Sequence, residues 1–564
     1  MGSTSRRDFL KLGIGSVSAL VLTAGAGVKE NALADPAYST PGRTPGMIDR
    51  YIDPLPIPKP IKPYETRKDA DFYRVRMMEF RKQLHSQLPP TRLWGYEGQY
   101  PGPTFEAMSG RRVEVQWENH LPLEHLFPID THLHGAMAPA PAVRVVPHLH
   151  GSRTASLSDG MPEGWFVPGA SVRYTYPNQQ QGATLWYHDH AMGITRLNVY
   201  AGLSGFYFLR DRQELGMNLP SGDYEIPLTL QDRILDDEAQ LVYAPTRDDG
   251  VRVPQGTWGP QFFGDLPVVN GALYPYLNVE PRMYRLRVLN ACNGRFLNLY
   301  LNQARSPADI PALVRFYQIG SDGGLLGKPA PLEKVLLGPA ERADLLVDFT
   351  GLEGKTITLS NDAAAPYPGW SRLNALYALL PELMQFRVTE SVTEAGRSAG
   401  KVFDLAATME LPRLDANEAV VTRDFVLAEN MDMHGNSMGM QINGKGYADA
   451  VTEFPKLGTM EKWRFINTTD DTHPMHLHLV QFQILERRGF DYGTFVRQGK
   501  LQFVGTPRPP APNEAGWKDT AIVNPHDVLT ILVRFEGFTG RYVYHCHMAE
   551  HEDNDMMRPF EVVA

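Results

Sequence analysis

Alternating apolar and polar residues mark three short segments that share one pattern. Val113–Trp117 alternates with a period of two residues and runs into Glu118 and Asn119. Tyr284–Asn290 and Trp463–Asn467 alternate in the same way and also end on asparagine. A two-residue period is typical of a half-buried β-strand, and asparagine favours the turn that closes it. The three segments lie about 170 to 180 residues apart, which is roughly one β-sandwich each.

A second set of strands repeats at the same spacing, at residues 182–187, 354–359 and 540–544. The first and third of these strands run into histidines, whereas the middle one runs into Ser360-Asn361-Asp362. We therefore predict an all-β chain of three consecutive β-sandwich domains, with chemistry in the outer two and a spacer between them. The predicted domains are residues 35–215, 216–395 and 396–564, with the boundaries in the segments 211–223 and 389–401. The composition of Asp71–Gln87 predicts one short helix on the first domain.

Composition excludes several classes of protein. The 564 residues are 43% hydrophobic and 21% charged, which is typical of a folded chain and not of a disordered one. The net charge of −9 argues against non-specific DNA binding, and no nucleic-acid or nucleotide motif is present. Two cysteines, Cys292 and Cys546, exclude a disulfide scaffold, although one bridge remains formally possible.

Residues 1–34 have the form of a twin-arginine export signal. Arg6 and Arg7 precede a weakly apolar stretch, and Ala32-Leu33-Ala34 supplies a small-residue cleavage site before Asp35. The stretch is shorter than the ~20 apolar residues of a membrane span, and no later segment would span a bilayer. We therefore expect a periplasmic or secreted protein that uses the twin-arginine export machinery. Because that route exports folded proteins, often with a cofactor inserted, we also expect a metal or redox cofactor.

The histidines are clustered. The chain has 17 of them, and ten fall in four short clusters, each of which contains a His-x-His pair. Residues i and i+2 of a strand point to the same face, so each pair presents two imidazoles side by side. Imidazole is a ligand for zinc, copper, iron and nickel, so four such pairs predict metal binding. The clusters are His148 and His150; His188 and His190; His473, His476 and His478; and His545, His547 and His551.

The fourth cluster indicates copper, because it contains Cys546 between His545 and His547. In a strand the cysteine and the two histidines point to opposite faces. A cysteine with two histidines and a weak axial methionine is the blue-copper electron-transfer arrangement. His551 and Met556 follow the cysteine at loop distance, and His473 is the best second imidazole. The eight other clustered histidines, half from each outer domain, then form a separate cluster at a domain interface.

Four motifs resemble those of the multicopper oxidases, and of bacterial laccases of the spore-coat type in particular. The chain is also similar to bilirubin oxidases and phenoxazinone synthases. The motifs are HLHG at 148–151, WYHDHAM at 186–192, HPMHLH at 473–478 and HCHMAEHEDNDMM at 545–557. The segments 319–324 and Gly516–Thr520 also match, so the resemblance covers the chain from about Arg92 to Glu561.

The resemblance implies a fold, a cofactor and a ligand set. The three domains would be cupredoxin-like Greek-key sandwiches that hold four copper ions, namely one type 1, one type 2 and two type 3. It implies that the type 1 ligands are His473, Cys546 and His551, with Met556 axial. It implies His148 and His476 for type 2, and for type 3 it implies His150, His188, His190, His478, His545 and His547.

The activity implied is that of a laccase-like oxidoreductase. A phenol or aromatic amine would give single electrons to the type 1 copper, and oxygen would be reduced by four electrons to water at the trinuclear cluster. Asp159 and Glu552 match acidic positions near that cluster and are candidates to relay protons. The alternative is that Asp159 caps a turn and Glu552 orients His551.

Three features leave alternatives open. A second HLHG occurs at residues 132–135, and Met557 is an alternative axial ligand to Met556. Relatives carry a disulfide in the middle domain, whereas the corresponding segment here, Gly259–Phe263, has no cysteine, so we expect Cys292 to be a small buried side chain. The loop 363–380 is unlike the family pattern and lies where it would shape substrate access.

Other functions are also compatible with the sequence. One is a cuprous oxidase for copper tolerance, for which Met431, Met433, Met438 and Met440 form a modest group that packing explains equally well. Oxidation of bilirubin or aminophenols is another. A copper-free scaffold protein of the same fold is the alternative that is not an enzyme, but such proteins lose ligands that this chain keeps. The expected partners are therefore oxygen and a small phenolic or aromatic amine reductant, or Cu(I).

Overall fold

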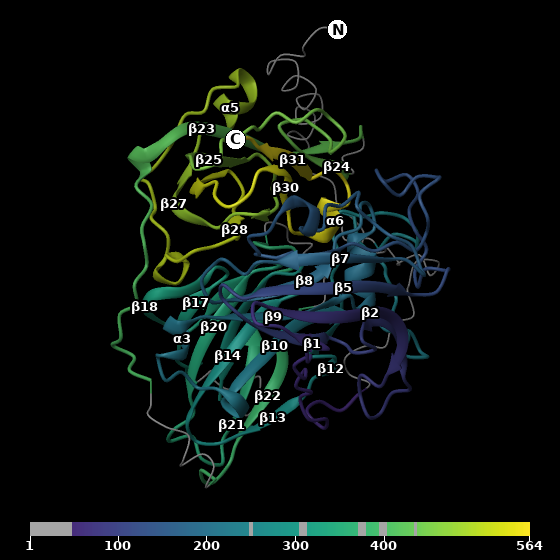
Figure 1. Cartoon of the computed structure of the whole chain (residues 1–564), viewed down its shortest axis with the longest axis vertical. Coiled ribbons are helices and arrows are strands. Elements are labelled where there is room, and N and C mark those ends of the chain that lie inside the picture. Colours follow the sequence, from purple (N-terminus) through teal and green to yellow (C-terminus); the bar gives the residue numbers. More distant parts are fainter. Residues whose placement is uncertain (1–47, 248–251, 304–312, 370–378, 394–402, 434–436) are drawn as a thin grey trace, which may run out of the picture.

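The computed structural model describes residues 48–247, 252–303, 313–369, 379–393, 403–433 and 437–564. Six β-sheets, two per domain, account for most of this part of the chain (Figure 1). Helices are few and short: α2 (Thr195–Ala201), α3 (Arg212–Leu215), α5 (Tyr492–Gln498) and α6 (Ala549–Glu552). Within the described ranges, none of the helices is long and apolar enough to cross a membrane. The predicted all-β fold class is therefore confirmed.

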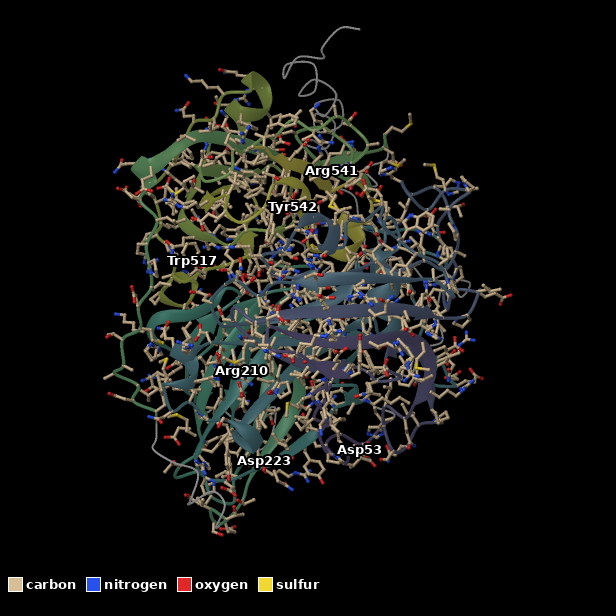
Figure 2. The ribbon with its side chains drawn as sticks, in the orientation of Figure 1. Asp53, Arg210, Asp223, Trp517, Arg541 and Tyr542 are labelled. Atoms are coloured by element: carbon tan, nitrogen blue, oxygen red, sulfur yellow. The ribbon has the colours of Figure 1, made fainter. Side chains whose placement is uncertain are left out.

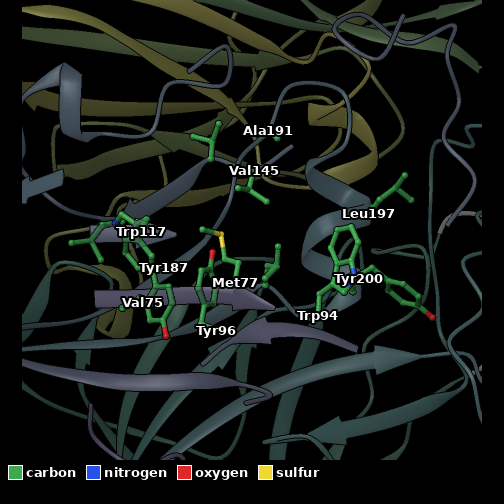
Figure 3. Close-up of a cluster of buried hydrophobic side chains, with 14 of the residues drawn as sticks. Val75, Met77, Trp94, Tyr96, Trp117, Val145, Tyr187, Ala191, Leu197 and Tyr200 are labelled. Atoms are coloured by element: carbon green, nitrogen blue, oxygen red, sulfur yellow. The ribbon is translucent and has the colours of Figure 1, made fainter. Parts of the chain in front are cut away.

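The first sandwich packs a five-stranded sheet against a four-stranded one. The larger sheet contains β1 (Glu65–Thr66), β2 (Ala70–Lys82), β3 (Thr91–Tyr96), β5 (Arg112–His120) and β7 (Ser171–Tyr176). The smaller sheet has the order β4 (Gly102–Met108), β9 (Ser204–Arg210), β8 (Ala183–Asp189) and β6 (Pro147–His150). Large side chains such as Trp94, Tyr96, Trp117 and Tyr187 fill the space between the sheets (Figure 3).

The middle sandwich has the largest sheets. One has the order β12 (Ala272–Leu273), β11 (Leu266–Val269), β10 (Glu225–Arg233), β14 (Met283–Asn290), β20 (Arg342–Asp348), β17 (Phe316–Ser321) and β18 (Gly324–Leu332). The other contains β13 (Tyr276–Val279), β22 (Glu382–Val388), β21 (Thr356–Asn361), β15 (Leu297–Asn302), β16 (Leu313–Val314) and β19 (Val335–Leu337). Its aliphatic core includes Cys292, a small buried side chain as expected.

The third sandwich again has five and four strands. The larger sheet has the order β24 (Ser437–Ile442), β23 (Ala419–Met431), β25 (Met460–Asn467), β29 (Asp527–Arg534) and β27 (Phe482–Gly489). The smaller has the order β28 (Thr520–Val523), β26 (His473–Leu477), β30 (Gly540–Cys546) and β31 (Met557–Val562). The predicted domain boundary at 215/216 falls between β9 and β10, and the one at 395/396 lies outside the described residues. They stay predictions.

One strand arrangement recurs in all three sandwiches. The three segments that alternate and end on asparagine are β5, β14 and β25, and each lies between a parallel and an antiparallel neighbour. Each terminal asparagine, Asn119, Asn290 or Asn467, accepts a hydrogen bond at its Oδ1 atom from the main-chain N–H two residues later, at 2.9 to 3.1 Å. Such a side-chain turn closes the strand without leaving a buried N–H unpaired.

The predicted helix at Asp71–Gln87 is wrong, because this segment forms most of strand β2. Arginine, methionine and glutamate give it a helical composition, but Phe72, Val75 and Met77 are buried while Arg74 and Arg76 are exposed. The segment Ala70–Met78 of β2 pairs with the whole length of β5. Burial on a sheet therefore outweighed intrinsic propensity, as tertiary context commonly does.

The three sandwiches contact one another directly (Figure 2). The Tyr542 hydroxyl of the third sandwich donates to the Thr154 carbonyl of the first at 3.0 Å. The main-chain carbonyl of Trp517 accepts an N–H from the middle sandwich at 2.8 Å. Arg210, at the end of the first sandwich, pairs with Glu225 at the start of the middle one at 2.7 Å. The outer sandwiches therefore meet each other as well as the middle one.

The asparagine turn predicts a stability effect in the middle sandwich. Asn290→Ala removes the bond to the Cys292 N–H and two amide donations, to the Arg295 and Leu337 carbonyls, each at 2.9 Å. Because these partners are buried, we expect the free energy of unfolding to fall by about 2–4 kcal/mol. Calorimetry of the metal-free protein measures the change. The exposed Asn278→Ala is the control, and an equal shift in both variants contradicts the prediction.

Candidate metal centre

Two His-x-His strands face each other where the outer sandwiches meet. His148 and His150 end β6, and His476 lies in β26 with His478 directly after it. The His148 and His478 rings stack with their centroids 3.9 Å apart, and the His150 and His476 rings stack at 3.7 Å. The two pairs therefore run in opposite directions across the interface. This arrangement brings four imidazoles from segments more than 300 residues apart into one buried site.

The other two His-x-His pairs close the site from the adjoining strands. His188 lies in β8 and His190 directly after it, and His545 lies in β30 and His547 directly after it. His190 lies 5.0 Å from His545 and His188 lies 5.2 Å from His547, ring centroid to centroid. Strands β8 and β6 pair with each other, as do β30 and β26, so the sheets fix the spacing. We call these eight residues the histidine cluster.

The ligand sets implied by the family resemblance can be located within the histidine cluster. His150, His188 and His547 form a triad with centroid distances of 4.9 to 5.7 Å. His190, His478 and His545 form a second triad at 5.0 to 5.4 Å. The remaining two are His148 and His476, whose centroids are 6.1 Å apart. These distances are compatible with the predicted type 3 and type 2 ligand sets, but His148–His478 and His150–His476 lie closer together, so the sets stay predictions.

Hydrogen bonds at the outer edge of the cluster orient its rings. The Nδ1 atoms of His148, His188 and His476 lie 2.6 to 2.8 Å from main-chain carbonyls. A carbonyl only accepts, so each of these Nδ1 atoms carries the proton and each Nε2 keeps a lone pair. These Nε2 atoms are buried and have no hydrogen-bond partner among the described residues. Orphaned lone pairs that converge on one space fit a bound metal.

Electrostatics keeps these rings neutral. Burial, together with the neighbouring imidazoles, lowers the pKa of His148 and His478 well below the usual histidine value. Burial lowers the pKa of His188 to about 4. A neutral imidazole is the form that binds a metal ion, so the cluster is ready to act as a ligand set near neutral pH.

Three buried carboxylates contact the cluster. Asp159 Oδ2 lies 2.7 Å from His478 Nδ1, and the Asp159 carbonyl is the partner of His148. The two Glu552 oxygens lie 3.3 Å from His190 Nδ1 and 3.2 Å from His545 Nδ1. The third is Asp519. The alternative that Glu552 orients His551 is not what the contacts show, because its partners belong to the histidine cluster.

Cys546 lies on the opposite side of its strand from the flanking histidines, as predicted from strand geometry. Its Sγ atom is 3.5 Å from His473 Nδ1 and 3.6 Å from His551 Nδ1, and those two nitrogens are 3.3 Å apart. All three side chains are fully buried. The Thr469 hydroxyl, placed by the Asn467 turn, lies 2.6 Å from His473 Nε2 and fixes that ring from behind. We call this group the cysteine site.

Met556 is the axial candidate that the structure favours. It is fully buried in the same apolar cluster as Cys546, and its main-chain carbonyl accepts the Cys546 N–H at 3.0 Å. Met557 begins β31 and packs in a different cluster, against Met192 and Tyr447. The axial role of Met556 stays a prediction.

The second HLHG motif lies outside the cluster. The His132 side chain is 95% exposed, and His134 Nδ1 lies 3.5 Å from Asp555 Oδ1. Neither residue joins a group of convergent ligand atoms among the described residues. The structure therefore brings the predicted pair, His148 and His150, into the site. Residues 370–378 of the loop 363–380 lie outside the described residues.

Asp519 is a site residue that the sequence patterns do not identify, although it lies in the Gly516–Thr520 segment that resembles the family. Asp519 Oδ1 lies 3.1 Å from His150 Nε2, and the Asp519 carbonyl lies 2.8 Å from His476 Nδ1. Asp519 lies directly before β28, and the pairing of β28 with the histidine strand β26 brings it to the cluster. A spacing pattern along one strand gives no information about contacts across a sheet, which is why it was missed.

Paired β-sandwiches with a buried Cys–His₂ group joined through one strand to an eight-histidine cluster define a copper-dependent redox protein. Comparison with known proteins supports that class. Two multicopper oxidase family models match, at residues 81–214 and 422–564. A laccase of Bacillus subtilis is 42% identical, covering 91% of this chain and 99% of that protein. A laccase of Haloferax volcanii is 37% identical, covering 100% of this chain and 91% of that protein.

Solved structures give the same result. The multicopper oxidase McoA of Aquifex aeolicus matches with a TM-score of 0.71 and 26% identity, covering 91% of this chain and 99% of that one. A multicopper oxidase of Pediococcus acidilactici matches with a TM-score of 0.71 and 27% identity, covering 94% of both chains. The chain belongs to the multicopper oxidase family, and copper is the metal of that family.

Proposed function

We propose that the protein is a laccase-like multicopper oxidase that oxidises phenols or aromatic amines and reduces oxygen to water. The observation that carries this proposal is the union of two sites: the cysteine site, and the histidine cluster that begins at the next residue on either side of Cys546. The 37–42% identity to laccases over most of the chain supports it. The complete ligand set argues against a copper-free scaffold protein.

The implied ligand sets would hold four copper ions: one at the cysteine site, one at the His148–His476 pair and one at each histidine triad. Copper bound there supplies one-electron redox chemistry on the substrate side and four-electron reduction on the oxygen side. The chain itself fixes the lone pairs of the imidazoles by hydrogen bonds at their outer nitrogens. It also excludes water, because the side chains of both sites are buried.

Oxidation of Cu(I) is the second candidate, and one structural observation favours it. Met431, Met433 and Met438 are 52%, 88% and 63% exposed, so packing does not explain them, whereas Met440 is fully buried. They lie on or next to the β23–β24 hairpin, which meets the loop after His551 through Asn554. Exposed thioethers close to the cysteine site are suited to a soft cation.

Oxygen uptake by the copper-loaded protein separates these two functions. With a methoxyphenol and Cu(I) as donors, we expect faster uptake with the phenol. Cys546→Ser, which removes the thiolate ligand, is expected to abolish uptake with both donors. If Cu(I) is the faster donor, and the triple variant Met431→Leu/Met433→Leu/Met438→Leu loses that activity only, the Cu(I) function replaces the laccase function.

We further propose that Asp159 and Glu552 bind and transfer the protons that water formation requires. Each carboxylate reaches a ring nitrogen on the outer side of the cluster, Asp159 at His478 and Glu552 between His190 and His545. A carboxyl group in that position donates or accepts a proton without leaving its partner. The alternative for Asp159, capping a turn, describes its main-chain N–H bond to the Ser156 carbonyl but leaves its carboxylate unexplained.

The Glu552→Gln variant tests this proton role. The amide keeps the size of the side chain but does not exchange a proton, so we expect turnover to fall by about 10- to 100-fold. The blue absorption of the cysteine site and the copper content should stay unchanged, because the Glu552 carboxylate lies at His190 and His545 of the histidine cluster. Steady-state oxygen uptake measures the rate, with the exposed Glu561→Gln as control. Normal turnover in Glu552→Gln would refute the role.

Export by the twin-arginine route is a separate proposal. It is supported by Arg6, Arg7 and the Ala32–Ala34 site, which lie outside the described residues. We expect the exported protein, in the periplasm or the medium, to begin at Asp35, as measured by amino-terminal sequencing. Replacing both arginines with lysine should retain the protein in the cytoplasm. Export of the lysine variant at a normal level would overturn the proposal.

A further inference from the structure

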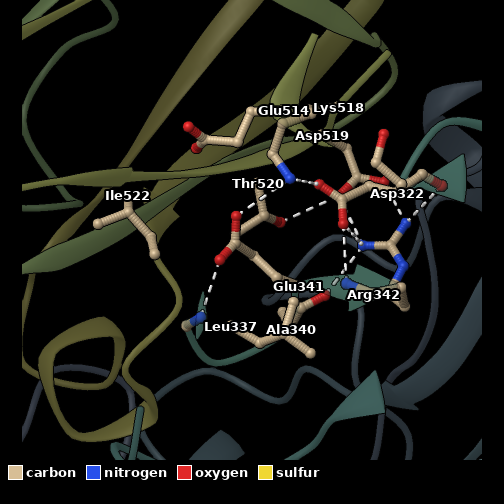
Figure 4. Close-up of polar contacts among 12 residues, drawn as sticks. Asp322, Leu337, Ala340, Glu341, Arg342, Glu514, Lys518, Asp519, Thr520 and Ile522 are labelled. Atoms are coloured by element: carbon tan, nitrogen blue, oxygen red, sulfur yellow. Dashed lines mark hydrogen bonds and ion pairs between the residues drawn. The ribbon is translucent and has the colours of Figure 1, made fainter. Parts of the chain in front are cut away.

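The middle sandwich supplies no histidine to the cluster, yet one of its side chains reaches the cluster's edge. Arg342, the first residue of β20, forms a two-pronged ion pair with Asp519 of the third sandwich (Figure 4). Nη1 lies 2.7 Å from Asp519 Oδ1 and Nη2 lies 2.5 Å from Oδ2. Both side chains are fully buried. A paired fork of this kind fixes a carboxylate in position and in plane.

Every N–H of the Arg342 guanidinium has a partner. Besides the two bonds to Asp519, Nε donates to the Thr184 carbonyl at 2.9 Å, Nη1 to the Ala340 carbonyl at 2.9 Å and Nη2 to the Asp322 carbonyl at 3.1 Å. Thr184 belongs to β8 of the first sandwich, the strand that leads to His188. One guanidinium therefore joins all three sandwiches, and all five of its donors are used.

Asp519 passes this constraint on to two rings of the histidine cluster. Its Oδ1 lies 3.1 Å from His150 Nε2, and its carbonyl lies 2.8 Å from His476 Nδ1. These are the two rings that stack at 3.7 Å. His150 is turned the opposite way to His148, His188 and His476: its Nε2 faces outward, and its Nδ1 has no partner among the described residues. A carboxylate at Nε2 holds the proton there and leaves the Nδ1 lone pair for a metal.

Two further contacts hold the ion pair in place. Lys518 Nζ lies 2.8 Å from Asp322 Oδ2 and 3.0 Å from Glu341 Oε1. Lys518 directly precedes Asp519 and Glu341 directly precedes Arg342, so the residues next to the ion pair are also bound to each other. Gly151, which follows His150, has a φ of +85°, and a Cβ added to it would lie 2.5 Å from Asp519 Oδ2. The main chain of the histidine motif thus packs directly on the pair, which explains why the motif ends in glycine.

We infer that Arg342 is a positioning residue for the oxygen-reducing site, acting through Asp519 on the orientation and tautomer of His150 and on His476. The middle domain is then more than a spacer, because it sets part of the ligand geometry of the histidine cluster. This inference rests on the proposed function, since it assumes that the histidine cluster holds copper.

The test compares Arg342→Met with Arg285→Met. Arg285, in β14, is also a buried arginine with a two-pronged ion pair, to Asp344 at 2.8 and 2.5 Å, and it contacts Glu214 instead of a site residue. Loss of either arginine removes a buried two-pronged ion pair, although Asp344 keeps Arg287 at 3.1 Å, so both variants should lose stability. Only Arg342→Met is expected to retain copper in the histidine cluster about 10- to 100-fold more weakly, measured as copper released to a chelator. The blue absorption of the cysteine site should persist in both.

A second readout does not depend on copper. In the metal-free protein labelled with ¹⁵N-histidine, the nuclear magnetic resonance spectrum distinguishes the two neutral tautomers of an imidazole. We expect the Nε2-protonated signal that disappears in His150→Gln to be altered in Arg342→Met and unchanged in Arg285→Met. An unaltered signal together with normal copper retention in Arg342→Met overturns the inference.

Milder variants keep the inference testable if Arg342→Met does not fold. Arg342→Lys keeps the charge but not the fork, and Asp519→Asn keeps the shape but not the charge. Because Arg342 acts through Asp519, the double variant Arg342→Lys/Asp519→Asn should retain copper no more weakly than Asp519→Asn alone. If the losses of copper retention in the two single variants add up in the double variant, the inference is contradicted. A wild-type protein that binds no copper in the histidine cluster would instead overturn the proposed function, so the two failures are distinguishable.

Discussion

The meeting of two antiparallel His-x-His strands at the interface between the outer sandwiches is the constraint on which the rest of the structure depends. Stacking His148 on His478 and His150 on His476 buries the Nε2 atoms of His148 and His476 and the Nδ1 atom of His150, which have no hydrogen-bond partner among the described residues. Burying such groups is costly unless a metal satisfies them. The sheets therefore bring the rings together, and a bound metal ion would supply the missing partner of their unpaired nitrogens.

That constraint explains what the middle sandwich contributes. It has the same strand arrangement as its neighbours, but β21 ends in Ser360 and Asn361 where the equivalent strands β8 and β30 lead into histidines. Its chemistry lies instead at β20, where Arg342 bonds to the first and third sandwiches at once. The two outer sandwiches must align four strands that lead into histidines. A side chain of the middle sandwich that bonds to both of them helps to fix this alignment.

The sequence predicted most of the fold and both sites because their patterns are local. Period-two alternation located β5, β14 and β25, and strand geometry separated Cys546 from His545 and His547. The segment that became β2 shows the limit, because its arginines, methionines and glutamate favour a helix, whereas pairing with β5 requires a strand. Arg342 and Asp519 show another, since they are 177 residues apart and neither lies in a repeating pattern. Contacts of that kind depend on the docking of whole domains, which no local pattern encodes.

The cysteine site and the histidine cluster are also joined by a contact besides Cys546 itself. Asp553, at the end of α6, accepts main-chain N–H bonds from Thr195 and Arg196 at 3.0 Å, at the start of α2. Helix α2 follows closely on His190, and α6 carries His551. A shift of α6, which holds His551, would therefore displace the segment that holds His190. Because the strand with Cys546 also carries His545, the two sites are connected on both sides.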